Sequence, residues 1–220
     1  DDEAGEKKTL EMSGRKGIGV KADDLLDQVI AKAKHEIQER DRDLDHAAVE
    51  VLSRQIAVAA VRYFMVKQTT TRVIAFDFDE ALSFEGDSGP YLQYSAVRAR
   101  NILKKMSASG LPVRVTAEQA TAVRAEAWDD DLWDLMLTVA QSAEVLERAA
   151  STLELSLVAR QALELAQKFN AVYHRHPVVQ ETDETLRTAR LTAVLVFLRG
   201  LETLSGVLGM EETINETIEY

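Results

Sequence analysis

A glycine-rich turn and the start of a helix meet in residues 84–94, Phe84-Glu85-Gly86-Asp87-Ser88-Gly89-Pro90-Tyr91-Leu92-Gln93-Tyr94. Gly86, Gly89 and Pro90 are residues that favour turns. Either Ser88 or Asp87 can cap a following helix, and a proline suits the first helical turn. The helical pattern then continues to Leu103, so the stretch predicts a turn followed by a capped helix.

The helix after this turn has two chemically distinct faces. One stripe is apolar and can pack on a core: Leu92, Ala96, Ala99, Leu103 and Met106. The other stripe, which we call the tyrosine–arginine face, comprises Tyr91, Tyr94, Arg98, Asn101 and Lys105. Cations that hold phosphates and aromatic rings that stack on bases are typical of RNA-binding surfaces. The pattern alone also fits a simpler alternative, which is a solvated helix face with two half-buried tyrosines.

Composition limits the class of protein. The chain has 220 residues, of which 46% are hydrophobic and 29% charged, as expected of a folded protein. Cysteine is absent, which excludes disulfides and favours the cytoplasm as the location. We expect no signal peptide and no membrane-spanning segment. The net charge of −11 argues against indiscriminate binding of DNA or other polyanions, while a local basic stripe can still bind one RNA.

Apolar residues recur at helical spacing through most of the chain, which predicts an all-α protein. Helices are expected from Asp23, over residues 47–66, after Asp129, over residues 155–173 and from Thr188. A short extended segment is expected near residues 72–78, where β-branched and aromatic residues gather. The acidic residues beside it are expected to cap a helix. The two histidines His174 and His176 lack further ligands in register, so we expect no metal site.

Several stretches resemble arginyl-tRNA synthetases. The sequence FEGDSGPYLQYSAVRARNIL is similar to the entry of their anticodon-binding domain, and the preceding F-D-F-D-E-A-L-S also fits that family. Residues 168–173 resemble the family's F-N-x-[FY]-Y element. Residues 188–191, Thr-Ala-Arg-Leu, loosely resemble the D-A-L-R signature of this domain, although the aspartate is absent. Residues 207–210, Val-Leu-Gly-Met, resemble its usual ending.

A second resemblance lies near the start of the chain. Residues 12–17, Met-Ser-Gly-Arg-Lys-Gly, resemble the class I synthetase loop K-M-S-K-[SR], which closes over ATP. The resemblance implies that Ser13, Arg15 and Lys16 steady the ATP phosphates, because mobile cations offset charge that develops on phosphate oxygens. The chain departs from the general class I pattern at Glu11 and Gly14, where that pattern has lysines.

The resemblance implies an all-α helical bundle of the class I anticodon-binding (DALR) type. It divides the chain into a catalytic-domain loop (residues 1–22), a helical connecting region (23–83) and the anticodon-binding domain (84–220). It implies binding of tRNA-Arg by the following residues: Tyr91, Gln93, Tyr94, Arg98, Asn101, Asn170, Tyr173 and Met210.

The implied activity is the ATP-dependent attachment of arginine to tRNA. None of the four histidines lies in the H-x-G-H context that class I enzymes use. We therefore expect these 220 residues to bind tRNA without catalysis and without a cofactor of their own, while ATP and magnesium serve the full-length ligase. Two other functions remain compatible with the residues: a free-standing helical RNA-binding adaptor, and a helical scaffold that binds protein through the tyrosine face.

Overall fold

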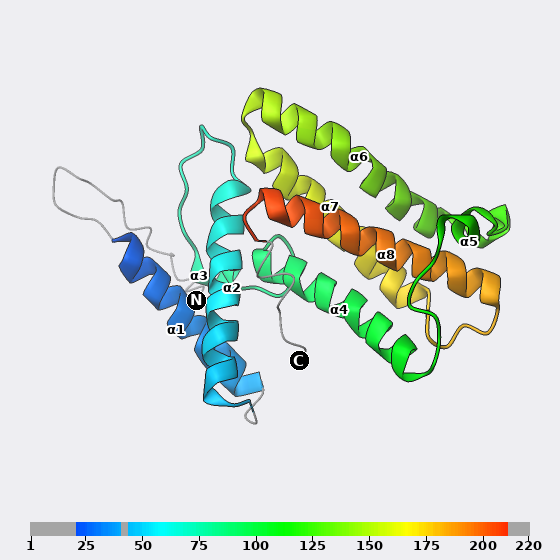
Figure 1. Ribbon diagram of the computed structural model, residues 1–220. Coiled ribbons are helices and arrows are strands. Elements are labelled where there is room, and N and C mark those ends of the chain that lie inside the picture. The colour runs from blue at the N-terminus through cyan, green and yellow to red at the C-terminus, as the bar shows by residue number, and fades with distance from the viewer. Residues whose placement is uncertain (1–20, 41–43, 211–220) are drawn as a thin grey trace, which may run out of the picture.

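The computed structural model describes residues 21–40 and 44–210, and this part of the chain is helical, without a strand (Figure 1). The all-α prediction is therefore confirmed. Residues 73–77, within the expected extended segment, have no regular secondary structure. The elements are α1 (Ala22–Arg40), α2 (His46–Val66), α3 (Phe78–Ala81), α4 (Gly89–Ala108), α5 (Ala117–Thr121), the 3-10 helix η2 (Ala125–Ala127), α6 (Asp130–Thr152), α7 (Leu155–Arg175) and α8 (Glu184–Val207).

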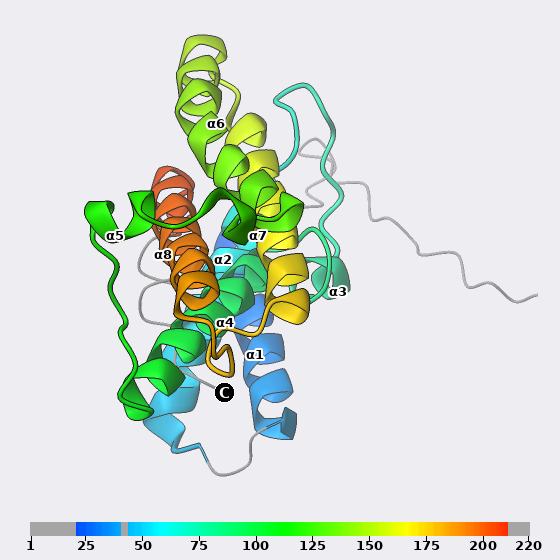
Figure 2. The same ribbon diagram turned by 90° about the vertical axis from the view of Figure 1, so that its right-hand side faces the viewer.

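The helices form two groups that share α2. In Figure 1, α4, α6, α7 and α8 lie side by side as a bundle, while α2 crosses one end of that bundle and α1 packs on the far side of α2. Seen from the side, α5 lies beside α8 (Figure 2). One hydrophobic cluster joins α1, α2 and α3, and the other fills the bundle. Ala59 and Tyr63 of α2 belong to the second cluster, so α2 connects both cores.

Most helices begin at a capping side chain, and the sequence predicts the caps of α3 and α4. Ser88 is the cap of α4, because its Oγ accepts the backbone N–H of Tyr91 at 3.2 Å and Pro90 follows in the first turn. Asp77, which was expected to cap rather than to bind metal, accepts the N–H groups of Asp79 and Glu80. Asp183 caps α8, so that helix begins earlier than the expected Thr188. Each cap satisfies N–H groups that have no partner within the helix.

The arginine of the Thr-Ala-Arg-Leu stretch has a structural role. Arg190 is largely buried, and its guanidinium forms an ion pair with Glu181 at 2.6 Å. It also donates to the backbone oxygen of Pro177 at 2.7 Å. Both partners lie in the connection between α7 and α8, so Arg190 holds this connection against α8.

Charged groups also close the bundle where α7 ends and α6 begins. Arg175 donates to both carboxylate oxygens of Asp131 at 2.9 Å, and the His176 ring lies 3.1 Å from Asp131 and 3.4 Å from Asp129. Hydrogen bonds from Arg175 and then His176 hold the pKa of Asp131 below its ordinary value of 3.8. Among residues 21–40 and 44–210, no group of three or more His, Cys, Asp or Glu side chains is placed to hold a metal ion.

Asp131→Asn is expected to lower the melting temperature near pH 7 by about 3 °C, as for a partly exposed ion pair. A depressed carboxyl pKa contributes stability that is present above the unfolded-state pKa and is lost as the pH falls through the folded-state pKa. The wild type should therefore lose melting temperature below about pH 4, and the variant should lose less. Thermal unfolding monitored by circular dichroism between pH 2.5 and 7 measures the difference.

Asp130→Asn is the matched control, because Asp130 lies in the same first turn of α6 and is exposed. In this control the melting temperature should fall at low pH as much as it does in the wild type. Equal pH dependence in the wild type and in Asp131→Asn would contradict the prediction.

Candidate nucleic-acid interface

The tyrosine–arginine face lies on α4, directly after the cap at Ser88. Tyr94 is exposed at 37% of its maximum, Tyr91, Arg98 and Asn101 are half-buried, and Lys105 is exposed. The opposite stripe of α4 packs into the bundle core, since Leu92, Ala96, Ala99 and Met106 are buried. The two faces predicted from the helical period are therefore present.

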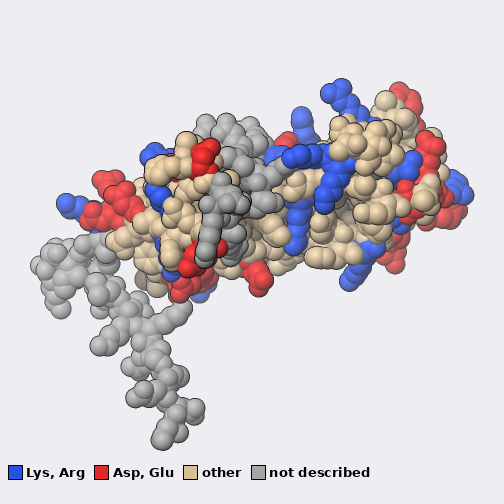
Figure 3. Space-filling view, turned by 90° about the horizontal axis from the view of Figure 1, so that it is seen from below, with Lys and Arg blue, Asp and Glu red and all other residues tan. Residues whose placement is uncertain are grey.

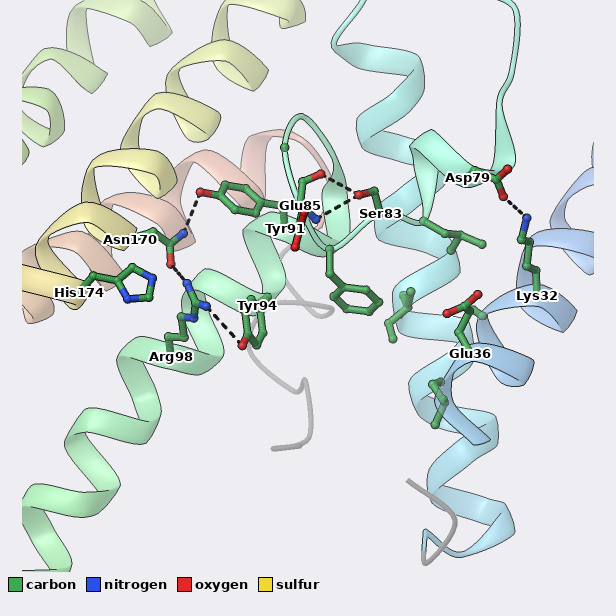
Figure 4. Close-up of a pocket in the computed structure, with 16 residues that line it drawn as sticks. Lys32, Glu36, Asp79, Ser83, Glu85, Tyr91, Tyr94, Arg98, Asn170 and His174 are labelled. Atoms are coloured by element: carbon green, nitrogen blue, oxygen red, sulfur yellow. Dashed lines mark hydrogen bonds and ion pairs between the residues drawn. The ribbon is translucent and has the colours of Figure 1, made fainter. Parts of the chain in front are cut away.

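Arg98 joins this face to the C-terminal part of α7. Its guanidinium carbon lies 4.3 Å from the centre of the Tyr94 ring and 5.2 Å from the centre of the Tyr173 ring. Its nitrogens donate to Asn170 Oδ1 and lie 3.4 Å from the Tyr94 hydroxyl (Figure 4). No Asp or Glu of the described chain forms an ion pair with Arg98. The positive charge is therefore stacked on aromatic rings without a carboxylate to neutralise it.

Asn170 lies behind Arg98 and is 7% exposed. Its amide nitrogen lies 3.0 Å from the Tyr91 hydroxyl, 2.8 Å from Ser95 Oγ and 2.9 Å from the backbone oxygen of Ala166. The side chain therefore connects α4 and α7 and orients both Arg98 and Tyr91. Its burial suits a positioning role better than the direct RNA contact expected from the sequence.

Two expected RNA-binding residues lie in the interior. Gln93 is 1% exposed, because it points towards α2, where its amide lies 3.4 Å from the backbone oxygen of Gln55. Met210 is fully buried in the bundle core. Neither side chain reaches the surface, so the expectation that they contact RNA does not fit this structure. Ser13, Arg15 and Lys16 lie outside the described residues.

A cavity of about 950 Å³ opens in front of the tyrosine–arginine face. Figure 4 shows Tyr91, Tyr94, Arg98, Asn170 and His174 along one wall, and Lys32 and Glu36 of α1 across from them. Lys32 forms an ion pair with Asp79 at the same side. The RNA-binding residues expected from the sequence include neither His174 nor any residue of α1. No local pattern marks these residues, because packing of distant segments brings them to the cavity.

Charge is distributed unevenly over the surface. In the view from below, Lys and Arg side chains spread over the middle of the described surface, while acidic side chains gather towards its ends (Figure 3). α4, the lowest helix of the bundle in Figure 1, has no acidic residue between Gly89 and Ala108. It carries four basic ones: Arg98, Arg100, Lys104 and Lys105. In a chain of net charge −11, an acid-free helix of this kind suits a polyanionic ligand.

Comparisons with known proteins agree with the sequence resemblance. Residues 92–213 match the model of the DALR anticodon binding domain, and residues 4–79 match that of the class I (R) tRNA synthetase catalytic domain. An arginine–tRNA ligase of Halorubrum lacusprofundi is 35% identical over 215 residues, which cover 91% of this chain and 36% of that protein. An arginine–tRNA ligase of Deinococcus radiodurans is 36% identical over 209 residues, covering 91% and 33%.

Solved structures show the same relationship. The arginyl-tRNA synthetase of Thermus thermophilus superposes with a TM-score of 0.75 and 30% identity over 90% of this chain and 32% of that one. That of Plasmodium falciparum, at 20% identity and a TM-score of 0.72, shares the fold. The chain thus spans about a third of the length of these relatives and matches their C-terminal region.

No described helix has the length and apolar character that crossing a membrane requires. The resemblance to arginyl-tRNA synthetases is confirmed, on the family matches and on the relatives that cover about nine-tenths of the chain. Because the first family match extends over more than half of the 220 residues, this chain belongs to the family of DALR anticodon-binding domains.

Proposed function

We propose that this chain is the tRNA-binding, C-terminal part of a cytoplasmic arginine–tRNA ligase, and that it binds tRNA-Arg. The observation that carries the proposal is the arrangement of Arg98 between Tyr94 and Tyr173, on a helix without acidic residues. Stacked guanidinium and phenol groups can hold phosphates and unpaired bases of a folded RNA. The relatives named arginine–tRNA ligase support the choice of tRNA as the ligand.

Within this function we assign the contacts to exposed or half-exposed side chains of the site: Tyr91, Tyr94, Arg98, Asn101 and Tyr173. Asn170 supports them from beneath, by holding Arg98 and Tyr91. Gln93 and Met210 are left out because they are buried.

We further propose that the chain divides into a catalytic-domain loop (1–22), a connecting region (23–83) and the anticodon-binding domain (84–220). The two hydrophobic clusters support a boundary near residue 83, since the first ends with Leu82 and Phe84 and the second takes α4 and the helices after it. α2 contributes to both clusters, which explains how the two parts pack together.

The ligase to which this part corresponds would use ATP, with magnesium, to activate arginine. We assign phosphate binding to Ser13, Arg15 and Lys16 on their chemistry alone, because a hydroxyl and two cations in a glycine-flanked loop suit phosphate oxygens. The 220 residues contain no H-x-G-H sequence. We therefore propose that they do not activate arginine by themselves.

The test is direct binding of a fluorescently labelled arginine tRNA transcript to the purified 220-residue chain, followed by fluorescence anisotropy. Binding should weaken by tenfold or more between about 50 and 200 mM salt, because phosphate contacts release counterions. An aspartate tRNA transcript should bind more weakly. The same preparation should show no arginine-dependent ATP–pyrophosphate exchange.

The outcomes separate the proposed function from its alternatives. Absence of tRNA binding at low salt would contradict the proposed function and favour the protein scaffold. A tRNA affinity that does not depend on salt would do the same. Equal affinity for the two transcripts would favour a general RNA-binding adaptor. Pyrophosphate exchange by these residues would overturn the assignment of the chain as catalytically incomplete.

A further inference from the structure

A buried hydroxyl group joins α2, the loop before α4 and the start of α7. Tyr63 of α2 is 1% exposed. Its hydroxyl donates to Asp87 Oδ1 at 2.6 Å and lies 3.3 Å from the backbone oxygen of Ala159 in α7. Burial raises the pKa of this hydroxyl, and the Asp87 carboxylate raises it further. The group therefore stays protonated and remains a hydrogen-bond donor at physiological pH.

Lys67, the C-cap residue of α2, holds the same loop residue. Its side chain is 7% exposed, although it carries a charge. Its ammonium group donates to the backbone oxygen of Asp87 at 2.8 Å and to Glu80 Oε1 at 2.7 Å, and lies 3.4 Å from Asp87 Oδ2. Both the main chain and the side chain of Asp87 are thus fixed by α2.

Asp87 lies at the point where the loop leads into α4. It immediately precedes Ser88, the cap of that helix, so its position sets where α4 begins. Ala159 lies in α7, the helix that carries Asn170 and Tyr173. One hydroxyl therefore contacts the residue before the cap of the helix that carries Tyr94 and Arg98, and also the helix that completes their site.

We propose that Tyr63, supported by Lys67, is a positioning residue for RNA binding: through Asp87 and α7 it sets the spacing at which Arg98 stacks between Tyr94 and Tyr173. The inference rests on the proposed function. The side chains of a binding site must be held within about 0.5 Å of the positions that binding requires, and supporting side chains outside the contact surface provide this precision. Tyr63 itself is too deeply buried to touch the RNA.

Tyr63→Phe is the first test, because it removes the hydroxyl and keeps the buried ring. At a temperature where circular dichroism shows the variant fully folded, its dissociation constant for the arginine tRNA transcript should rise by about tenfold. The salt dependence should stay that of the wild type, because no phosphate contact is lost. A hydroxyl that only stabilised the fold would leave the affinity of the folded molecules unchanged.

Thr192→Val is the matched control. Thr192 is also buried, at 8% exposed, and its hydroxyl donates to the backbone oxygen of Thr188 within the same helix. It belongs to α8 and lies outside both α7 and the loop that starts α4. This control should lower stability and leave tRNA affinity within about twofold of the wild type.

A double-mutant cycle identifies the route of the effect. If Tyr63 acts through Arg98, adding Tyr63→Phe to Arg98→Ala should cost less than about twofold in affinity. Asp87→Ala, at an exposed loop residue, should show the same loss of tRNA affinity as Tyr63→Phe. This variant also provides the test if Tyr63→Phe does not fold.

Wild-type affinity in both Tyr63→Phe and Asp87→Ala would overturn the inference, as would full additivity with Arg98→Ala. Either result leaves the proposed function intact. Failure of the wild-type chain to bind tRNA would instead contradict the proposed function.

Discussion

Gly89→Ala is expected to destabilise the fold by about 3 kcal/mol. A Cβ atom at this position would lie 2.2 Å from the backbone oxygen of Ala59, 2.5 Å from its carbonyl carbon and 3.0 Å from the nitrogen of Ala60. These are main-chain atoms in the middle of α2, so no side chain can rotate away to make room. The start of α4 must move off α2, and the packing between the two cores loosens with it.

Urea unfolding followed by circular dichroism measures this change. Gly86→Ala is the matched control in the same loop, because Gly86 has φ +80° and no atom lies within 4 Å of the added Cβ. Its left-handed conformation should cost about 1 kcal/mol. Equal stability of the two variants would show that the helices do not approach each other at Gly89 as closely as the structure indicates.

Arg98→Ala is expected to weaken binding of the arginine tRNA transcript by ten- to a hundredfold at low salt. The guanidinium is stacked on Tyr94 and Tyr173 and has no carboxylate partner within the described residues, so its charge is available to a phosphate. A charge-assisted hydrogen bond contributes about 1.5–3 kcal/mol, which corresponds to this range. The slope of log affinity against log salt concentration should also become about one unit less steep, because one phosphate contact is lost.

Arg148→Ala is the control for charge alone. Arg148 is exposed on α6, away from α4. Its loss changes the net charge by the same amount as Arg98→Ala does, and it should alter the affinity for tRNA less than about twofold. Arg98→Lys should give an intermediate loss, because it keeps the charge and loses the planar, stacking group. An Arg98→Ala variant that binds as the wild type does would remove the tyrosine–arginine face from the RNA surface.

Local residue chemistry accounts for much of what could be predicted here. Ser88 caps α4 and Asp77 caps α3, as polar residues before helical runs should. The apolar and polar stripes of α4 come from a period of 3.6 residues, and the structure shows both. The predicted start of α8 is too late, because its cap, Asp183, precedes the Thr-Ala-Arg-Leu stretch on which the prediction was based.

The amino-acid sequence by itself determined the helical class, the capped start of α4 and the family, because caps, periodicity and motifs act over a few neighbouring residues. Only the tertiary structure decided which polar side chains face solvent: Gln93 is covered by α2, and Met210 by the bundle core. It also decided that Arg98 meets Tyr173 of α7. Such contacts depend on how separate helices pack, and the helical period describes each helix alone.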